Sequence, residues 1–268
     1  MPIESIIAIL LYLCAAAWWS VIAFRSGSPG PRPKYILVAF ASVPLFLHAM
    51  VLYPTIVTDS GLNMGFYNAL SLTCWTVALI VILATLLRPV ENLAIVFLPA
   101  AALSLWLEQL LPSVRIVPGS APTGLRIHVV LSIGAYGLLA VAAVQALVVA
   151  LQERQLRIRH PVGVMRMLPP LQTMEDFLVQ MLTLGFFLLS LSLATGLMFL
   201  QDLLGQHLAH KTVLSILAWF IFGFVLYGRW ARGWRGQRLA GWTFGGFLSL
   251  MLAYFGSKFV LELILHRV

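Results

Sequence analysis

The chain has 268 residues, of which 61% are hydrophobic and only 10% are charged, and its mean hydropathy is +0.96. Soluble domains carry roughly 25% charged residues, and a soluble core could not bury so much apolar surface. The composition therefore excludes a soluble globular protein and predicts an integral membrane protein, in which the net charge of +8 indicates basic loops rather than nucleic-acid binding.

Eight apolar stretches reach the length of a membrane helix, which is about 20 residues. They predict an all-α polytopic membrane protein with about eight transmembrane helices. We divide the chain into an N-terminal four-helix membrane part, residues 1–124, and a second four-helix membrane part, residues 125–268, within one integral membrane unit. The predicted spans are about 5–24, 35–53, 66–87, 93–111, 127–151, 177–200, 212–229 and 242–265.

The distribution of basic residues predicts the orientation of these spans. The first stretch begins with Glu4 and has no Lys or Arg, unlike a signal peptide, so we interpret it as a retained helix. With an outside N-terminus, 12 of the 17 Lys and Arg residues fall in the inner gaps and 5 fall elsewhere. This bias predicts a multi-pass protein of a bacterial inner (cytoplasmic) membrane with both termini in the periplasm.

The two cysteines, Cys14 and Cys74, both lie in apolar stretches, and the chain has no CxxC or CxxCH motif. This pattern argues against thiol–disulfide exchange and against covalently attached c-type haem. We interpret both cysteines as packing residues.

Five of the six histidines fall in the outer half of this predicted topology. His128 begins the fifth span, His266 ends the eighth, His48 lies in the second, and His207 and His210 lie in the gap before the seventh. Neutral imidazole is the usual axial ligand of haem iron and a common ligand of zinc and copper. These histidines are therefore candidate ligands, and the alternative is that they are interfacial residues whose polar tips reach head-group water.

His128 and His266 form the strongest candidate pair because they lie at similar depth at the outer ends of two helices. If the fifth and eighth helices are neighbours, the two imidazoles can ligate haem iron from opposite faces. His207 and His210 could share one helical face, but only Asp202 lies nearby as a third metal ligand.

Four charged residues are further candidates, Arg126 and Lys258 as cofactor-binding residues and Glu108 and Glu262 as weaker candidates. Lys258 and Glu262 are four residues apart on the last span, where an intrahelical pair lowers the cost of both charges. Glu108 lies near the outer end of the fourth span, at the expected depth of the head groups. Arg126 precedes His128 by two residues and, like Lys258, could bind a haem propionate, although a snorkelling arginine is the simpler interpretation.

Two long stretches resemble the C-terminal half of the cytochrome c assembly protein family, the CcsA- and HemX-type membrane proteins that handle haem at the outer membrane face. They are RIHVVLSIGAYGLLAVAAVQALVVALQERQLR and LAWFIFGFVLYGRWARGWRGQRLAGWTFGGFLSLMLAYFGSKFVLELILHR. The resemblance covers about residues 125–268. It rests on His128, Tyr136, Trp219, the GWRG of residues 233–236, the YFG of residues 254–256 and His266.

The resemblance implies non-covalent haem b near the outer face, with His128 and His266 as axial ligands of the iron. The family's haem-presenting members also have a tryptophan-rich WxWD loop, but the corresponding QDLLGQHLAHK contains no Trp. Their in-membrane histidine pattern, YLHTR, is replaced at Tyr227 by VLYGR. The chain is therefore most similar to the HemX/YpjD-type branch, and cytochrome c synthase activity is not expected.

Three functions follow in order of preference. The first is non-catalytic haem handling linked to cytochrome c assembly or maturation, with the lipid bilayer, haem and cytochrome maturation or other membrane proteins as partners and no nucleic acid. The second is a non-haem scaffold or regulatory partner that keeps the family fold. The third, a small-molecule or ion transporter that uses Lys258, Glu262 and Glu108, is disfavoured because no inverted repeat is evident.

The basic GWRGQR segment lies in a predicted inner gap. We interpret it as a determinant of topology and as a candidate contact for anionic lipid. Six tryptophans near the predicted interfaces indicate an aromatic belt. They are Trp18, Trp19, Trp106, Trp230, Trp234 and Trp242.

Overall fold

A computed structural model gives the fold of the chain. It describes residues 1–26, 31–111, 113–158, 168–199 and 209–256. Eight helices in the described residues are long and apolar enough to cross a membrane, which confirms the predicted all-helical membrane fold. The chain forms two compact units, residues 1–119 with 154–174, and residues 120–153 with 175 onward. The division at residue 124 that we expected from the sequence stays a prediction.

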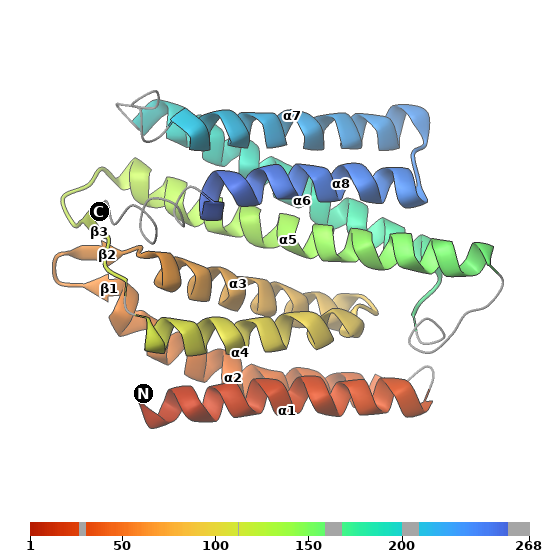
Figure 1. Ribbon diagram of the computed structural model, residues 1–268, viewed down its shortest axis with the longest axis horizontal. Coiled ribbons are helices and arrows are strands. Elements are labelled where there is room, and N and C mark those ends of the chain that lie inside the picture. Colours follow the sequence, from red (N-terminus) through yellow and green to blue (C-terminus); the bar gives the residue numbers. More distant parts are fainter. Residues whose placement is uncertain (27–30, 112, 159–167, 200–208, 257–268) are drawn as a thin grey trace. The chain divides into compact units, whose positions relative to one another are not determined.

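The first unit is a ring of four helices, drawn from red to yellow in Figure 1. Along the ring, α1 packs on α2, α2 on α3, α3 on α4, and α4 on α1. Ala8, Val51 and Leu105 form a buried cluster that joins α1, α2 and α4. The helices are α1 (Ile3–Ser26), α2 (Pro31–Ile56), α3 (Phe66–Leu87) and α4 (Ala94–Leu110), and the short 3₁₀ helix η1 (Glu91–Leu93) precedes α4.

A small antiparallel sheet caps one end of this unit. Its strands are β1 (Val57–Thr58), β2 (Gly61–Asn63) and β3 (Ile116–Pro118), in the order β1–β2–β3. The sequence did not predict these strands, because two or three residues are too few to show an alternating pattern. The sheet joins the α2–α3 connection to the segment that follows α4.

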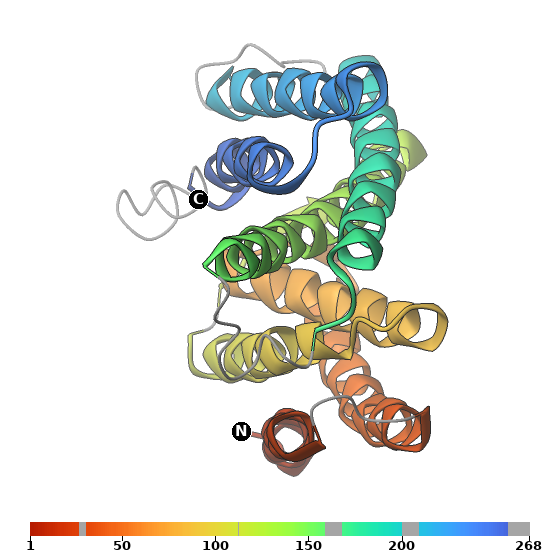
Figure 2. The same cartoon turned by 90° about the vertical axis from the view of Figure 1, so that its right-hand side faces the viewer.

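The second unit contains most of α5 (Thr123–Arg157) and of α6 (Leu171–Phe199), together with α7 (Ala209–Arg232) and α8 (Gly236–Met251). A π-helical turn, η3 (Leu252–Gly256), continues α8. Figures 1 and 2 show α6, in teal, crossing the other helices of the unit at an angle.

Close contacts define the neighbours within the second unit. Gly185 of α6 approaches Leu139 of α5 so closely that a Cβ would collide with the leucine side chain. The Trp219 indole of α7 stacks on Phe186 of α6, with ring centroids 5.5 Å apart. Gly246 of α8 lies against Phe222 of α7. Small residues thus let these helices approach where lipid provides no hydrophobic drive for association.

Several helix ends differ from the predicted spans. α8 begins at Gly236 rather than near residue 242, and α5 continues to Arg157 rather than to residue 151. These extra turns are polar, so hydropathy does not detect them, although helices continue readily beyond the hydrocarbon layer. α6 begins at Leu171 rather than near residue 177, and the acidic residues of this added part, Glu175 and Asp176, pair with groups on α7 and α8.

Large apolar side chains remain exposed on most helices. Examples are Phe46 on α2 (66% exposed), Leu87 at the end of α3 (84%) and Phe187 on α6 (59%). In water such surfaces would cause association, but in a bilayer they contact lipid chains. The exposed apolar surface therefore agrees with the membrane environment that composition predicts.

Candidate functional site

The imidazole of His128 is held by a backbone carbonyl on the neighbouring helix. His128 lies near the start of α5, half buried, and its Nδ1 is 2.8 Å from the carbonyl oxygen of Ser192 on α6. A carbonyl oxygen can only accept a hydrogen bond, so Nδ1 must carry the proton. In the neutral ring the lone pair is then on Nε2, which is the atom available to a ligand.

Three hydroxyl groups surround this imidazole. Ser132 Oγ donates to the backbone oxygen of His128 at 2.6 Å and lies 2.7 Å from Ser192 Oγ. Its distance to His128 Nε2 is longer, 3.4 Å. Thr195 Oγ1 lies 3.4 Å from Nδ1 but is closer to two backbone oxygens of α6. The short hydrogen bonds of Ser132 and Thr195 are therefore made with backbone and hydroxyl oxygens. The Nε2 atom of His128 has only the long contact with Ser132 Oγ.

An aromatic cluster brings α8 beside α5, two turns along α5 from His128. Tyr136 contacts Phe247 of α8 and Tyr254 and Phe255 of η3, with ring centroids 5.2, 6.0 and 5.3 Å apart. The sequence left open whether the fifth and eighth helices are neighbours, and these contacts establish that they are. The cluster ends one residue before Gly256, the last described residue.

Several candidates lie outside the described residues. They are His207, Lys258, Glu262 and His266. The backbone of His210 belongs to the first turn of α7, but its side chain is not described. Arg126 is on the same turn of α5 as His128 and is exposed. Arg126 and His128 thus share a turn of α5 but not a helix face, and the ligand role of His266 stays a prediction.

His48 belongs to the first unit, whereas His128 belongs to the second. His48 is fully buried in the first unit, where Tyr12 Oη lies 3.3 Å from Nδ1 and Ser71 Oγ lies 2.9 Å from Nε2. Both ring nitrogens thus have a hydrogen-bond partner within the helix ring. This geometry is that of a core histidine and leaves no nitrogen for a ligand without rearrangement.

Glu108 also belongs to the first unit. It lies near the C-terminal end of α4 and is only 5% exposed, and its expected depth at the head groups stays a prediction. Its carboxylate accepts a hydrogen bond from the side-chain amide of Gln109 at 3.4 Å, and Thr55 of α2 lies nearby. The position on α4 turns the side chain toward α2 rather than outward. Across the described part of the chain, no three His, Cys, Asp or Glu side chains are grouped to hold a metal ion.

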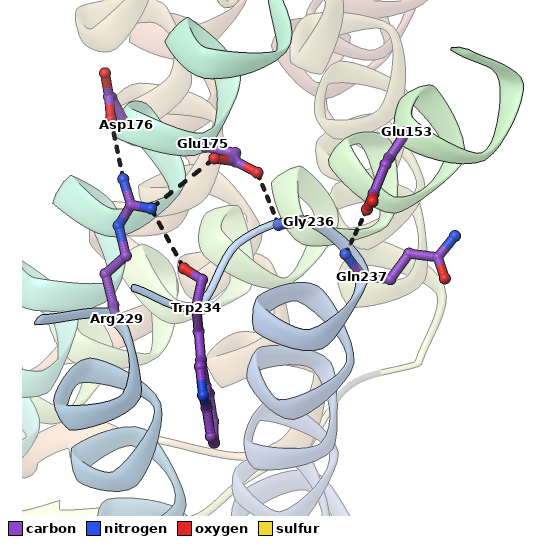
Figure 3. Close-up of polar contacts among 7 residues, drawn as sticks. All are labelled: Glu153, Glu175, Asp176, Arg229, Trp234, Gly236 and Gln237. Carbon is purple, nitrogen blue, oxygen red and sulfur yellow. Dashed lines mark hydrogen bonds and ion pairs between the residues drawn. The ribbon is translucent and has the colours of Figure 1, made fainter. Parts of the chain in front are cut away.

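A polar cluster at the other end of the second unit was not predicted from the sequence (Figure 3). Glu175 of α6 accepts a hydrogen bond from the backbone N–H of Gly236 at 2.7 Å, and Glu153 of α5 accepts one from Gln237 N–H at 2.6 Å. Arg229 of α7 lies between Glu175 and Asp176, at 3.9 and 3.4 Å. Two carboxylates thus cap the N-terminus of α8, where the helix dipole favours negative charge.

This cluster, which we call the α8 clamp, joins all four helices of the unit. Arg229 also donates to the backbone oxygen of Trp234 at 3.3 Å, which fixes the turn between α7 and α8. The acidic pair at 175–176 and the basic segment at 229–238 were visible in the sequence. Their pairing was not, because Glu175 and Arg229 are far apart along the chain.

The sequence matches a known protein family over most of its length. The family model described as "Cytochrome C assembly protein" matches residues 36–265. "Inner membrane protein YpjD" of Escherichia coli (strain K12) is 32% identical over 267 residues, which cover 98% of this chain and 100% of that protein.

More distant relatives match parts of the chain. "Protein HemX" of Brevibacillus brevis is 29% identical over 131 residues, 48% of each chain. "Cytochrome c biogenesis protein CcsA" of Gloeobacter violaceus is 29% identical over 93 residues, 34% of this chain and 28% of that protein. No solved structure matches this chain.

Proposed function

This chain belongs to the cytochrome C assembly protein family as a multi-pass protein of the inner membrane, and on that premise we propose that it binds haem b non-covalently. In this proposal, haem is held near the outer face by His128 and His266. The protein handles haem for cytochrome c assembly or maturation. Both termini lie on the outer side, as the distribution of Lys and Arg predicts.

The observation that carries the proposal is the orientation of the His128 ring. Metal-binding histidines usually donate the N–H that faces away from the metal to a carbonyl or carboxylate, which fixes the tautomer and the ring plane. The bond from His128 Nδ1 to the Ser192 carbonyl oxygen has this form. It leaves Nε2 as the basic atom, so the described residues fit an axial ligand of haem iron.

The contact between α5 and α8 supports the second ligand. Tyr136 holds Phe247 and the η3 turn against α5, and His266 follows η3 by ten residues in sequence. The aromatic rings also provide an apolar surface of the kind that porphyrins contact. Arg126 and Lys258 are the residues that we assign to the haem propionates, because guanidinium and ammonium groups bind carboxylates.

The proposed role is ligation and transfer rather than bond-making catalysis. Bound haem would supply the iron porphyrin that is handed to an acceptor. His128 would hold the iron, Ser192 would fix the imidazole tautomer through its backbone, and the apolar helix faces would exclude water. We therefore propose that the chain is not an enzyme.

One observation favours a second candidate function, a non-haem scaffold or regulatory partner. The segment QDLLGQHLAHK, residues 201–211 in the predicted outer gap, has no tryptophan with which to present a porphyrin. In that case His128 would be a structural link between α5 and α6. Purified protein that never binds haem would favour this second function.

A haem titration tests the proposal. Full-length protein purified in detergent is titrated with hemin while Soret absorbance is followed, and we expect saturation at about one haem per chain. His128→Ala and His266→Ala should each weaken binding at least about tenfold, because each removes an axial ligand. His160→Ala, in the predicted inner gap, is the matched control and should bind as the wild type does. Absence of saturable binding to the wild type would refute the proposal.

A further inference from the structure

The turn between α7 and α8 carries three exposed arginines at the surface of the membrane. Arg232 ends α7, Arg235 precedes α8, and Arg238 lies in the first turn of α8. The two flanking helices are each long and apolar enough to span a bilayer. The turn that joins them therefore lies where hydrocarbon gives way to head groups, which is the depth of lipid phosphates.

Two of these guanidinium groups are held by aromatic rings rather than by carboxylates. Arg232 lies over the ring of Tyr227 at 5.9 Å, and Arg238 lies over the ring of Trp234 at 5.6 Å. Trp234 is itself buried against Gly228, so its ring is a fixed platform. Stacking orients a guanidinium while its N–H donors stay available to an anion.

The nearby carboxylates are already engaged in the α8 clamp. Glu175 and Asp176 pair with Arg229, and Glu175 and Glu153 accept backbone N–H groups at the start of α8. No carboxylate within the described ranges pairs with Arg232, Arg235 or Arg238. The clamp therefore uses its carboxylates on Arg229, and among the described residues Arg232, Arg235 and Arg238 have no carboxylate partner.

The flanks of the turn are suited to lipid. Trp230 is 67% exposed and Trp242 is 46% exposed, and tryptophan prefers the level of the head groups and the upper acyl chains. Gly233, between Arg232 and Trp234, has a left-handed conformation (φ +64°), and no atom lies within 4 Å of the position of a Cβ. The surface beside the arginines is thus open and bordered by aromatic rings.

We propose that this turn binds the head-group phosphate of an anionic phospholipid through Arg232, Arg235 and Arg238. Guanidinium groups match phosphate oxygens in geometry and charge. A free anion would use only the arginines, whereas a phospholipid also places its glycerol and acyl chains against Trp230 and Trp242. The proposal concerns the end of the second unit that carries the α8 clamp and is independent of haem.

Lipid binding can be measured by native mass spectrometry of the full-length protein in detergent. Phosphatidylglycerol is added in steps, and phosphatidylcholine is the neutral comparison. The wild type should bind phosphatidylglycerol in preference. The triple variant Arg232→Gln, Arg235→Gln, Arg238→Gln should bind it about 100-fold more weakly, because each surface arginine contributes about 1 kcal/mol of attraction to anionic lipid. No preference in the wild type would overturn the proposal.

A second triple variant controls for net charge. Arg25→Gln, Arg32→Gln, Arg88→Gln removes the same charge from exposed positions on α1, on α2 and at the C-terminal end of α3. It should bind phosphatidylglycerol within about threefold of the wild type, because these arginines do not belong to the turn and exposed charges are screened by salt and water. Equal losses of phosphatidylglycerol affinity in both triple variants would show a general effect of net charge and would overturn the proposed lipid site.

Two further readouts separate this proposal from others. Inorganic phosphate at the same concentrations should not displace the bound lipid, and displacement would show that the turn binds free anions. The hemin affinity of the arginine variant should equal that of the wild type, so failure of the lipid proposal is distinguishable from failure of the haem proposal. An unchanged melting temperature in lipid-free detergent would confirm that the variant is folded.

Discussion

The carboxylate of Glu175 accepts a hydrogen bond from the backbone N–H of Gly236 at 2.7 Å, which ties α6 to the first residue of α8. Glu175 is only 4% exposed and also lies 3.9 Å from Arg229. The bond fixes one end of α8, while Tyr136 fixes the other end against α5. The position of the segment that follows η3 thus depends on contacts at both ends of α8.

Glu175→Gln should destabilise the protein. The amide keeps the shape of the side chain but removes the negative charge that faces Arg229 and the α8 N-terminus, at a cost of about 1.5–3 kcal/mol for hydrogen bonds to a charged group. Thermal unfolding in detergent measures the change. Asp176→Asn is the control, because its side chain is 48% exposed and an exposed ion pair contributes little. Equal losses of thermal stability in the two variants would contradict the stabilising role that we assign to Glu175 in the α8 clamp.

Gly236→Ala should cost more stability than Gly233→Ala. Both glycines have positive φ, +56° and +64°, so either alanine adds backbone strain of roughly 1 kcal/mol. At Gly236 a Cβ would also collide with the Glu153 carboxylate, whereas at Gly233 it would meet open space. Comparison of the two melting temperatures isolates the collision. Equal melting temperatures would mean that the Glu153 carboxylate moves aside at little cost and would contradict the prediction.

His48→Ala should lower stability without changing haem binding. Removal of the ring leaves a buried cavity and removes the hydrogen-bond partners of Tyr12 and Ser71, at a cost of about 2–5 kcal/mol. Thermal unfolding and hemin titration of the same preparation separate the two effects. A variant that kept its stability but lost haem would instead make His48 a ligand.

Tyr136→Leu should weaken haem binding by loosening the contact between α5 and α8. Each aromatic pair contributes about 0.5–1.5 kcal/mol beyond area burial, and Tyr136 makes three such contacts. Hemin titration should show an affinity about tenfold lower. Mutation of a residue that positions a metal ligand typically lowers metal affinity by about 10- to 100-fold. Phe187→Leu, on the lipid-facing side of α6, should bind hemin as the wild type does. Unchanged affinity in Tyr136→Leu would show that the cluster does not position the site.

Much of the fold could be predicted from hydropathy, because a membrane helix must be about 20 apolar residues long. All eight spans were found in this way, but the first turns of α8, from Gly236, were missed because they are polar. The strands β1 to β3 were missed because they are too short to produce a pattern. Helix packing was not predictable, since it depends on contacts such as Gly185 with Leu139.

The candidate site was predictable only in part. His128 could be chosen from its residue type and its place at the end of a span. Its partner, the carbonyl oxygen of Ser192, could not, because every residue has a carbonyl and the sequence carries no signal for this one. The burial of His48 and Glu108 was missed for a related reason, since the rotation of a helix that is apolar on all sides cannot be read from its pattern.

The central claim is that His128 is an axial haem ligand, and absorption spectra of the detergent-purified, hemin-loaded protein in its oxidised and reduced forms test it most directly. The wild type should show a Soret band and sharp reduced α and β bands, as expected for two imidazole ligands, and both His128→Ala and His266→Ala should lose or shift these bands. A wild type without such bands, or a His128→Ala variant with the same spectrum as the wild type, would contradict the account.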